Sequence, residues 1–108
     1  SPVQVMIIPI SDKFIGYADE VLSTLKNNAI RATLDSRNEK MGAKIRSAEL
    51  SKVPVMLILG EKEAESRTVS VRRRFIGSSG TIDLDTFVSS IKNEIDTRML
   101  LKEIENDC

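Results

Sequence analysis

The stretch Val53-Pro54-Val55-Met56-Leu57-Ile58-Leu59-Gly60 has the composition of a strand that is buried on both faces. Its apolar run from Val53 to Leu59 shows no alternation with polar residues, and Gly60 ends it. Such runs are typical of a central strand in a parallel sheet, because helices cover both faces of these sheets. The run is also far too short to cross a bilayer. It therefore predicts the middle strand of an α/β domain.

The first three of the four elements that precede this strand have clear strand or helix periodicity. The apolar run Val3–Ile10 predicts a buried strand. From Phe14 to Leu25, apolar residues recur at steps of three and four, which predicts an amphipathic helix with Ser11 or Asp12 near its N-cap. Residues 30–35 then alternate between apolar and polar, which is typical of a half-covered strand.

A further helix is expected before the central strand, and four more segments follow that strand. Asn38 follows a turn and can cap this helix. Residues 61–67 are charged and predict a loop or a short turn. Thr68–Arg74 alternates again and predicts a strand antiparallel to the central one, because only a charged loop joins the two. Residues 77–80 predict a flexible turn, and Asp83 opens a final amphipathic helix.

The order of these elements predicts an α/β fold of the three-layer type. Its mixed sheet is expected to be mostly parallel, with an antiparallel edge strand and with helices that flank it. No internal repeat or linker divides the chain. We therefore expect residues 1–108 to form one domain, with residues 99–108 as a C-terminal tail.

Composition excludes several classes of enzyme. The chain has no histidine and a single cysteine, Cys108, so it cannot assemble a usual zinc site or a Ser-His or Cys-His nucleophile pair. The first strand is not followed by the glycine spacing of a nucleotide-binding loop, and Asp35 alone does not make a receiver-type acidic site. We expect no cofactor in this chain. The lone cysteine and the lack of a secretory signal indicate the cytoplasm.

The net charge of zero hides an uneven distribution along the chain. Residues 31–74 carry eleven Lys/Arg against six Asp/Glu, whereas residues 75–108 carry three against seven. Such segregation suggests a polarised surface that attracts a polyanion on one side. Chance segregation of solvated charge explains the counts equally well.

Two segments at predicted strand ends carry side chains that suit single-stranded RNA. Asp35–Lys40 follows the second strand, and ligands of open α/β sheets bind outside such carboxyl ends. Within it, the Asn38 amide offers both a donor and an acceptor to a base edge. In Glu61–Glu65, after the central strand, a carboxylate can accept from the N1–H and N2–H₂ donors of an unpaired guanine. The plain alternatives are a helix cap and a solvated acidic loop.

The third candidate segment is Arg72-Arg73-Arg74. Strand alternation sends Arg72 and Arg74 to one face of the sheet and Arg73 to the other. An arginine fork can bind guanine O6 and N7 or a phosphate, although arginines also protect an edge strand from aggregation. We expect the three segments near one end of the sheet, as an unpaired RNA loop requires. The cations close by in sequence are Lys44, Arg46 and Lys52.

These motifs together resemble a known family. Residues 34–46 read LDSRNEKMGAKIR, Val53-Pro54 opens the apolar strand, residues 60–66 read GEKEAES and residues 69–72 read VSVR. With the opening residues 2–5, they are similar to the C-terminal anticodon-binding domain of threonyl-tRNA synthetase, over nearly all of the chain up to residue 98. Prolyl, glycyl and histidyl relatives share the fold but carry other residues in the first motif.

The resemblance implies a domain that binds the anticodon loop of threonine tRNA and does no chemistry itself. By position, the base-reading residues of the family correspond to Asn38, Glu63 and Arg72. Lys52 stands where the family often has arginine, which implies a phosphate contact or a weaker base contact. The candidate contacts to the RNA backbone are Arg37, Lys44, Arg46 and Arg74. The implied partners are the tRNA loop and the catalytic domain of the same enzyme, with no membrane and no DNA, and ATP and zinc are expected only in that catalytic domain.

Two other positions depart from the family pattern. Val55 follows Pro54 where relatives often place tyrosine, so any packing or stacking by that ring is missing. Ala29 replaces a common glycine, which affects the tightness of a turn rather than the function. Two other functions stay open: a protein-interaction or regulatory module of the same fold, and a small-ligand α/β domain such as a signalling receiver.

Overall fold

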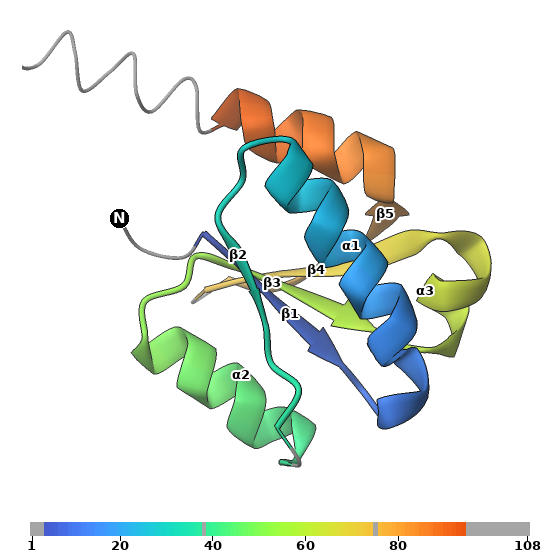
Figure 1. Cartoon of the computed structure of the whole chain (residues 1–108). Helices are drawn as coiled ribbons and strands as arrows, with labels where there is room; N and C mark the ends of the chain where they lie inside the picture. Colours follow the sequence, from blue (N-terminus) through green and yellow to red (C-terminus); the bar gives the residue numbers. More distant parts are fainter. Residues whose placement is uncertain (1–3, 38, 75, 95–108) are drawn as a thin grey trace, which may run out of the picture.

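The computed structural model describes residues 4–37, 39–74 and 76–94, and it contains a five-stranded mixed sheet in the order β2-β1-β3-β4-β5 (Figure 1). The parallel strands are β1 (Val5–Pro9), β2 (Ala32–Leu34) and β3 (Val55–Leu59). The antiparallel ones are β4 (Thr68–Arg73), which pairs with β3, and β5 (Gly77–Asp83), which pairs with β4. The prediction that the first three strands of the chain are parallel is confirmed.

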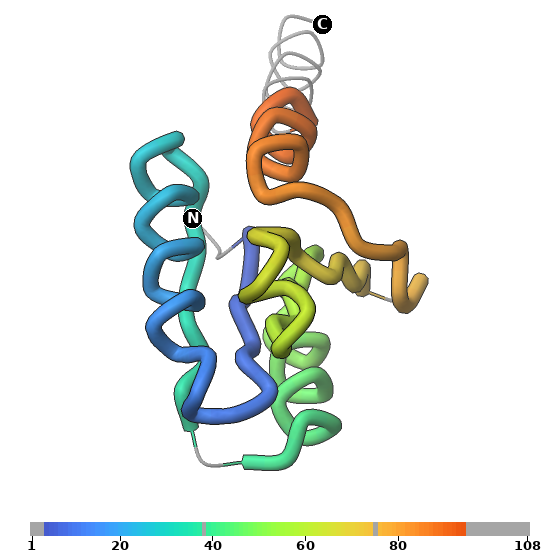
Figure 2. The backbone as a smooth tube through the Cα atoms, turned by 90° about the vertical axis from the view of Figure 1, so that its right-hand side faces the viewer, coloured from blue at the N-terminus to red at the C-terminus, as the bar shows by residue number. Residues whose placement is uncertain are grey.

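Helices cover both faces of this sheet. A short 3-10 turn, η1 (Asp12–Phe14), leads into α1 (Ile15–Asn27), which packs on the same face as the helix over residues 84–94. On the other face lies α2 (Met41–Leu50), so that α1 and α2 stand on opposite sides of β1 (Figure 2). A short helix, α3 (Glu61–Ser66), joins β3 to β4. Within the described part of the chain, no helix is long and apolar enough to cross a membrane.

Two apolar layers hold the sheet between the helices. The larger layer joins alternate strand residues to α1 and the last helix: Val5, Ile7, Val55, Leu57, Leu59, Val69, Val71, Ala18, Val21, Leu25, Leu84, Phe87, Val88 and Ile91. The smaller layer joins Ile8 and Met56 to Ala48 and Val53 beneath α2. Because β3 contributes to both layers, its lack of polar alternation is explained, and the prediction of a doubly covered central strand is confirmed.

Two elements differ from the expectations drawn from the sequence. Residues 77–80 belong to strand β5, not to a flexible turn, and β5 rather than β4 is the antiparallel edge of the sheet. The strand has no apolar alternation because it is largely exposed, and it forms through its backbone pairing with β4. Gly77 and Gly80 adopt φ values of 94° and 98°, which only glycine adopts readily. The charged segment after β3 is the helix α3, not a loop.

Helices α1 and α2 end in the same type of hydrogen-bonded turn, although neither has the usual glycine. The N–H groups of Ala29 and Ile30 donate to carbonyls in the last turn of α1, and Lys52 and Val53 repeat this arrangement after α2. This pattern is a Schellman motif, whose penultimate residue is left-handed. Ala29 and Lys52 accordingly have φ values of 60° and 63°, a conformation that costs a residue with a Cβ.

The expectation that Asn38 caps α2 is wrong. The N-cap of this helix is Lys40, so the position of Asn38 is not the helix cap. Asn38 itself and the expected tail at residues 99–108 lie outside the described residues. Ahead of the first helix, the hydroxyl of Ser11 accepts a 3.3 Å hydrogen bond from the Lys13 N–H and caps η1, whereas the N-cap of α1 itself is Phe14, which makes no side-chain cap hydrogen bond.

Candidate nucleic-acid interface

The carboxyl ends of β1, β2 and β3 meet at one edge of the sheet, because these strands are parallel neighbours. This edge brings together the segments that follow them, including two of the three predicted to contact RNA, Asp35–Lys40 and Glu61–Glu65. Ile10 lies between them: a Cβ placed on Gly60 would be 2.9 Å from Ile10 Cδ1 and 3.4 Å from Glu63 Oε2. We call this surface the carboxyl edge.

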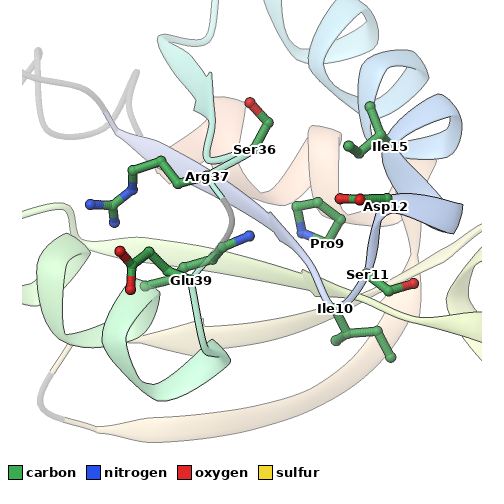
Figure 3. A pocket seen from close by; sticks show the side chains of 9 residues that line it. Pro9, Ile10, Ser11, Asp12, Ile15, Ser36, Arg37 and Glu39 are labelled. Carbon is green, nitrogen blue, oxygen red and sulfur yellow. The ribbon is translucent and has the colours of Figure 1, made fainter.

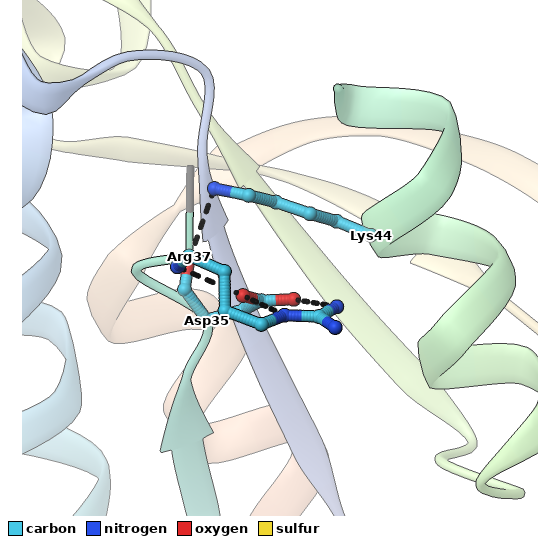
Figure 4. A network of polar contacts seen from close by, with 3 residues as sticks. All are labelled: Asp35, Arg37 and Lys44. Carbon is cyan, nitrogen blue, oxygen red and sulfur yellow. Dashed lines mark hydrogen bonds and ion pairs between the residues drawn. The ribbon is translucent and has the colours of Figure 1, made fainter. Parts of the chain in front are cut away.

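A network around Asp35 fixes the chain where it leaves β2. Arg37 donates to the Asp35 carboxylate through Nε at 3.0 Å and Nη2 at 2.9 Å, and through its backbone N–H at 3.2 Å. From α2, Lys44 Nζ donates to the Asp35 carbonyl oxygen at 3.2 Å (Figure 4). These hydrogen bonds from Arg37 lower the pKa of Asp35 despite its burial. The pairing therefore keeps the carboxylate charged and holds the guanidinium in one orientation.

A pocket of about 230 Å³ opens beside this network (Figure 3). Residues from three parts of the chain line it: Pro9, Ile10, Ser11, Asp12, Ile15, Ser36, Arg37, Glu39 and Lys44. Sequence reasoning did not single out most of these side chains, because a pocket wall shared by the end of β1, the end of β2 and α2 has no contiguous motif. The rule that ligands bind at the carboxyl ends of strands indicated only the region.

Glu63 lies in the first turn of α3, next to Ile10. Its Oε2 accepts a hydrogen bond from the Gly60 N–H at 3.3 Å, which anchors the side chain at the start of the helix. The residue is half-buried. Since an ionised carboxylate has more acceptor sites than this one bond uses, Glu63 keeps the capacity to accept from a ligand.

Two arginines of β4, Arg72 and Arg73, and Arg74 just after the strand lie farther from the carboxyl edge than expected. Arg72 is paired with Met56, three residues before Leu59, which is about 10 Å along a strand. The expectation that all three segments gather at one end is therefore wrong for the arginines. The physical reason is direction: β4 is antiparallel to β3, so Thr68 starts at the carboxyl edge and the arginines follow at the far end.

The alternation predicted for these arginines agrees with the structure. Arg73 turns to the face of the last helix, where its two terminal nitrogens donate to the Glu94 carboxylate at 3.1 Å each. Arg74 lies near the end of α2 on the opposite face, where its Nε donates to the Glu49 carbonyl oxygen at 2.9 Å. Arg72 pairs with Met56 of the α2-side layer, and its Nε is buried without an acceptor in the part of the chain that the structure describes.

The remaining predicted cations occupy different environments. Arg37 and Arg46 are exposed, whereas Lys44 is only 6% exposed. Lys52 is exposed in the turn after α2, at the opposite end of that helix from the carboxyl edge. The structure thus places Arg37, Lys44 and Glu63 at the carboxyl edge, and Arg72, Arg74 and Lys52 along the α2 side of the sheet.

Comparison with known proteins identifies relatives of the whole described region. The model of the anticodon binding domain family matches residues 4–94. Threonine–tRNA ligase of Clostridioides difficile (strain 630) is 56% identical over 98 residues, covering 91% of this chain and 15% of that protein. The ligase of Aquifex aeolicus (strain VF5) is 52% identical over 95 residues, covering 88% and 15%. The chain therefore spans about 15% of the length of these relatives.

Solved structures with the same fold come from several tRNA synthetases. The RNA binding domain of threonyl-tRNA synthetase from Cryptosporidium parvum Iowa II superposes with a TM-score of 0.80 at 28% identity, covering 86% of this chain and 24% of that chain. Histidyl-tRNA synthetase from Nostoc sp. PCC 7120 superposes with a TM-score of 0.81 at 18% identity, covering 88% and 23%. The second similarity is one of fold alone.

Proposed function

Because the chain belongs to the anticodon-binding domain family, as that domain of a threonine–tRNA ligase, we propose that it binds the anticodon loop of threonine tRNA. The structural observation that best supports this proposal is Arg72. Its guanidinium lies on the α2 side of the sheet with a buried Nε that has no acceptor among the described residues. An unpaired guanine offers two acceptors, O6 and N7, to such a group.

The other base contacts are assigned by position and chemistry. Glu63 accepts hydrogen bonds at the carboxyl edge, so it suits a base edge that presents donors. Asn38 is assigned by its match to the family motif. Contacts to the RNA backbone are assigned to the exposed Arg37 and Arg46, with Arg74 and Lys52 farther along the α2 side.

Catalysis is assigned to the rest of the ligase. We expect ATP, zinc and the joining of threonine to tRNA to involve the catalytic domain, and we expect this domain alone to bind tRNA without aminoacylating it. The chain then contributes affinity and discrimination among tRNAs, because bases are distinguished by hydrogen bonds to their edges.

A titration of the chain with the threonine anticodon stem-loop tests the proposal. We expect saturable binding by the wild type and about tenfold weaker binding by Glu63→Gln, because glutamine also presents N–H₂ donors where the base needs acceptors. Glutamine still serves as a capping partner for the Gly60 N–H, so folding is retained. The matched control is Glu65→Gln, which changes an exposed residue of the same helix. No binding by the wild type would exclude the function, and equal affinities of the two variants would exclude the role of Glu63.

A further inference from the structure

The pocket at the carboxyl edge contains a buried ammonium group. Lys44 lines this pocket and is 6% exposed. Within the described chain its Nζ has one hydrogen-bond acceptor, the Asp35 carbonyl oxygen at 3.2 Å, while Arg37 occupies the Asp35 carboxylate. An ammonium has three donors, and a buried charge is costly unless its hydrogen bonds are satisfied. The arrangement leaves donor capacity at the pocket.

The other walls of the pocket favour a flat polar ring over an anion. Pro9 and Ile15 provide apolar surface, whereas the Ile10 side chain points away from them toward Gly60 (Figure 3). Asp12 and Glu39 also line the pocket and offset the positive charges of Arg37 and Lys44, so the pocket has no net charge that would select a phosphate. A heterocyclic base has apolar faces, carbonyl acceptors and N–H donors, so it can use all of these groups. The volume of about 230 Å³ lies below the range of about 300–1,000 Å³ for drug-sized ligands, which suits a single base.

We propose that this pocket binds one unstacked nucleobase of the tRNA, with Lys44 Nζ donating to a carbonyl oxygen of the base and the ring lying against Pro9 and Ile15. The proposal rests on the function proposed above and adds a base-binding residue to it. Ile10 also adjoins Gly60 and Glu63, so a single RNA loop at the carboxyl edge reaches both the pocket and Glu63. Lys44 then contacts a base and not the phosphate backbone.

The test uses a series of threonine anticodon stem-loops in which an abasic nucleotide replaces one loop base at a time. Each stem-loop is titrated against wild type, Lys44→Met and the control Lys26→Met, which removes an exposed lysine of α1. We expect one loop position at which the missing base costs the wild type and Lys26→Met about tenfold in affinity, but costs Lys44→Met little. The same abasic profile for all three proteins would overturn the proposal.

Two further measurements keep the outcomes separate. If Lys44→Met fails to fold, Ser36→Trp fills the pocket from its exposed rim, with Ser23→Trp on α1 as the control. Ser36→Trp must then lose the same abasic response, and an unaltered response would overturn the proposal. If Lys44→Met instead binds every stem-loop more weakly by the same factor, and the slope of log affinity against log salt concentration falls by about one, Lys44 contacts a phosphate. That result would also overturn the proposal. If the wild type binds no stem-loop at all, the proposed function itself fails.

Discussion

Arg72 holds a polar group that has no hydrogen-bond partner among the residues that the structure describes. Its Nε is buried beside the α2-side layer, whereas the neighbouring Arg73 donates to Glu94 through two nitrogens. Leaving a buried donor unsatisfied costs about 1–3 kcal/mol. Arg72 and Arg73 are adjacent but lie on opposite faces of the sheet, so their alanine variants form a matched pair.

Arg72→Ala should weaken binding of the threonine anticodon stem-loop by about 1–3 kcal/mol and relax its preference for the guanine. Arg73→Ala should leave binding near the wild-type value and lower the free energy of unfolding, because it removes the ion pair to the last helix. Fluorescence titration and chemical denaturation measure the two effects. A loss for Arg72→Ala that is equal for every loop sequence would show a phosphate contact in place of a base contact.

Asp35 should make folding stability depend on pH in acid. Hydrogen bonds from Arg37 lower its folded pKa, so its contribution is fully present above the unfolded pKa of about 3.9 and is lost as the pH falls through the lower folded value. The free energy of unfolding of wild type should therefore exceed that of Asp35→Asn at pH 7, and the difference should shrink below about pH 4. Denaturation curves at several pH values, with the exposed Asp19→Asn as control, measure this difference. A difference that is constant with pH would contradict the pairing.

At the scale of the elements, the turn after α1 has backbone strain at Ala29 that a glycine would relieve. Ala29 is left-handed at φ 60° in a Schellman motif, where glycine is the usual residue. Ala29→Gly should raise the free energy of unfolding by about 0.5–1 kcal/mol, because relief of the Cβ penalty exceeds the added entropy of the unfolded chain. The same change at Ala43, exposed within α2, should lower it by a similar amount of about 0.5–1 kcal/mol. If both substitutions destabilise the protein, the backbone account of this turn is wrong.

How well the elements could be predicted depends on the range of the interactions that form them. β3 and α1 bury a face against neighbours, so their periodicity appears in the sequence. β5 lies at the edge with most residues exposed, and it forms only because β4 supplies its hydrogen bonds. α3 has 6 residues, which is too short for a helical apolar pattern. Sequence patterns detect burial, and neither of these elements has much of it.

The part of the candidate site that could be predicted from the sequence is the part whose position depends on the direction of the strands. The end of β2 and the end of β3 share an edge because both strands are parallel to β1. The offset of Arg72 follows from the antiparallel pairing of β4, which the sequence predicts, because the direction of this strand carries its arginines away from the carboxyl edge. The pocket with Lys44 depends on how α2 packs over β1 and β3, which no local pattern encodes.

Across the whole molecule, the proposed RNA contacts lie on two surfaces: the carboxyl edge, which carries Glu63 and Lys44, and the α2 side of the sheet, which carries Arg72. These groups lie on different elements, so only an extended ligand contacts all of them. A splayed single-stranded loop has this shape, and its unpaired bases present the edges that such side chains select.

The most direct test is a binding competition among stem-loops that share one stem and one loop framework and differ only in the anticodon. Bound labelled threonine stem-loop is displaced by each competitor at a fixed salt concentration, because affinity for RNA varies with salt. We expect the threonine anticodon to compete best, and replacement of its guanine to weaken competition by about tenfold or more. Equal competition by every anticodon would contradict the claim that this chain recognises the anticodon bases.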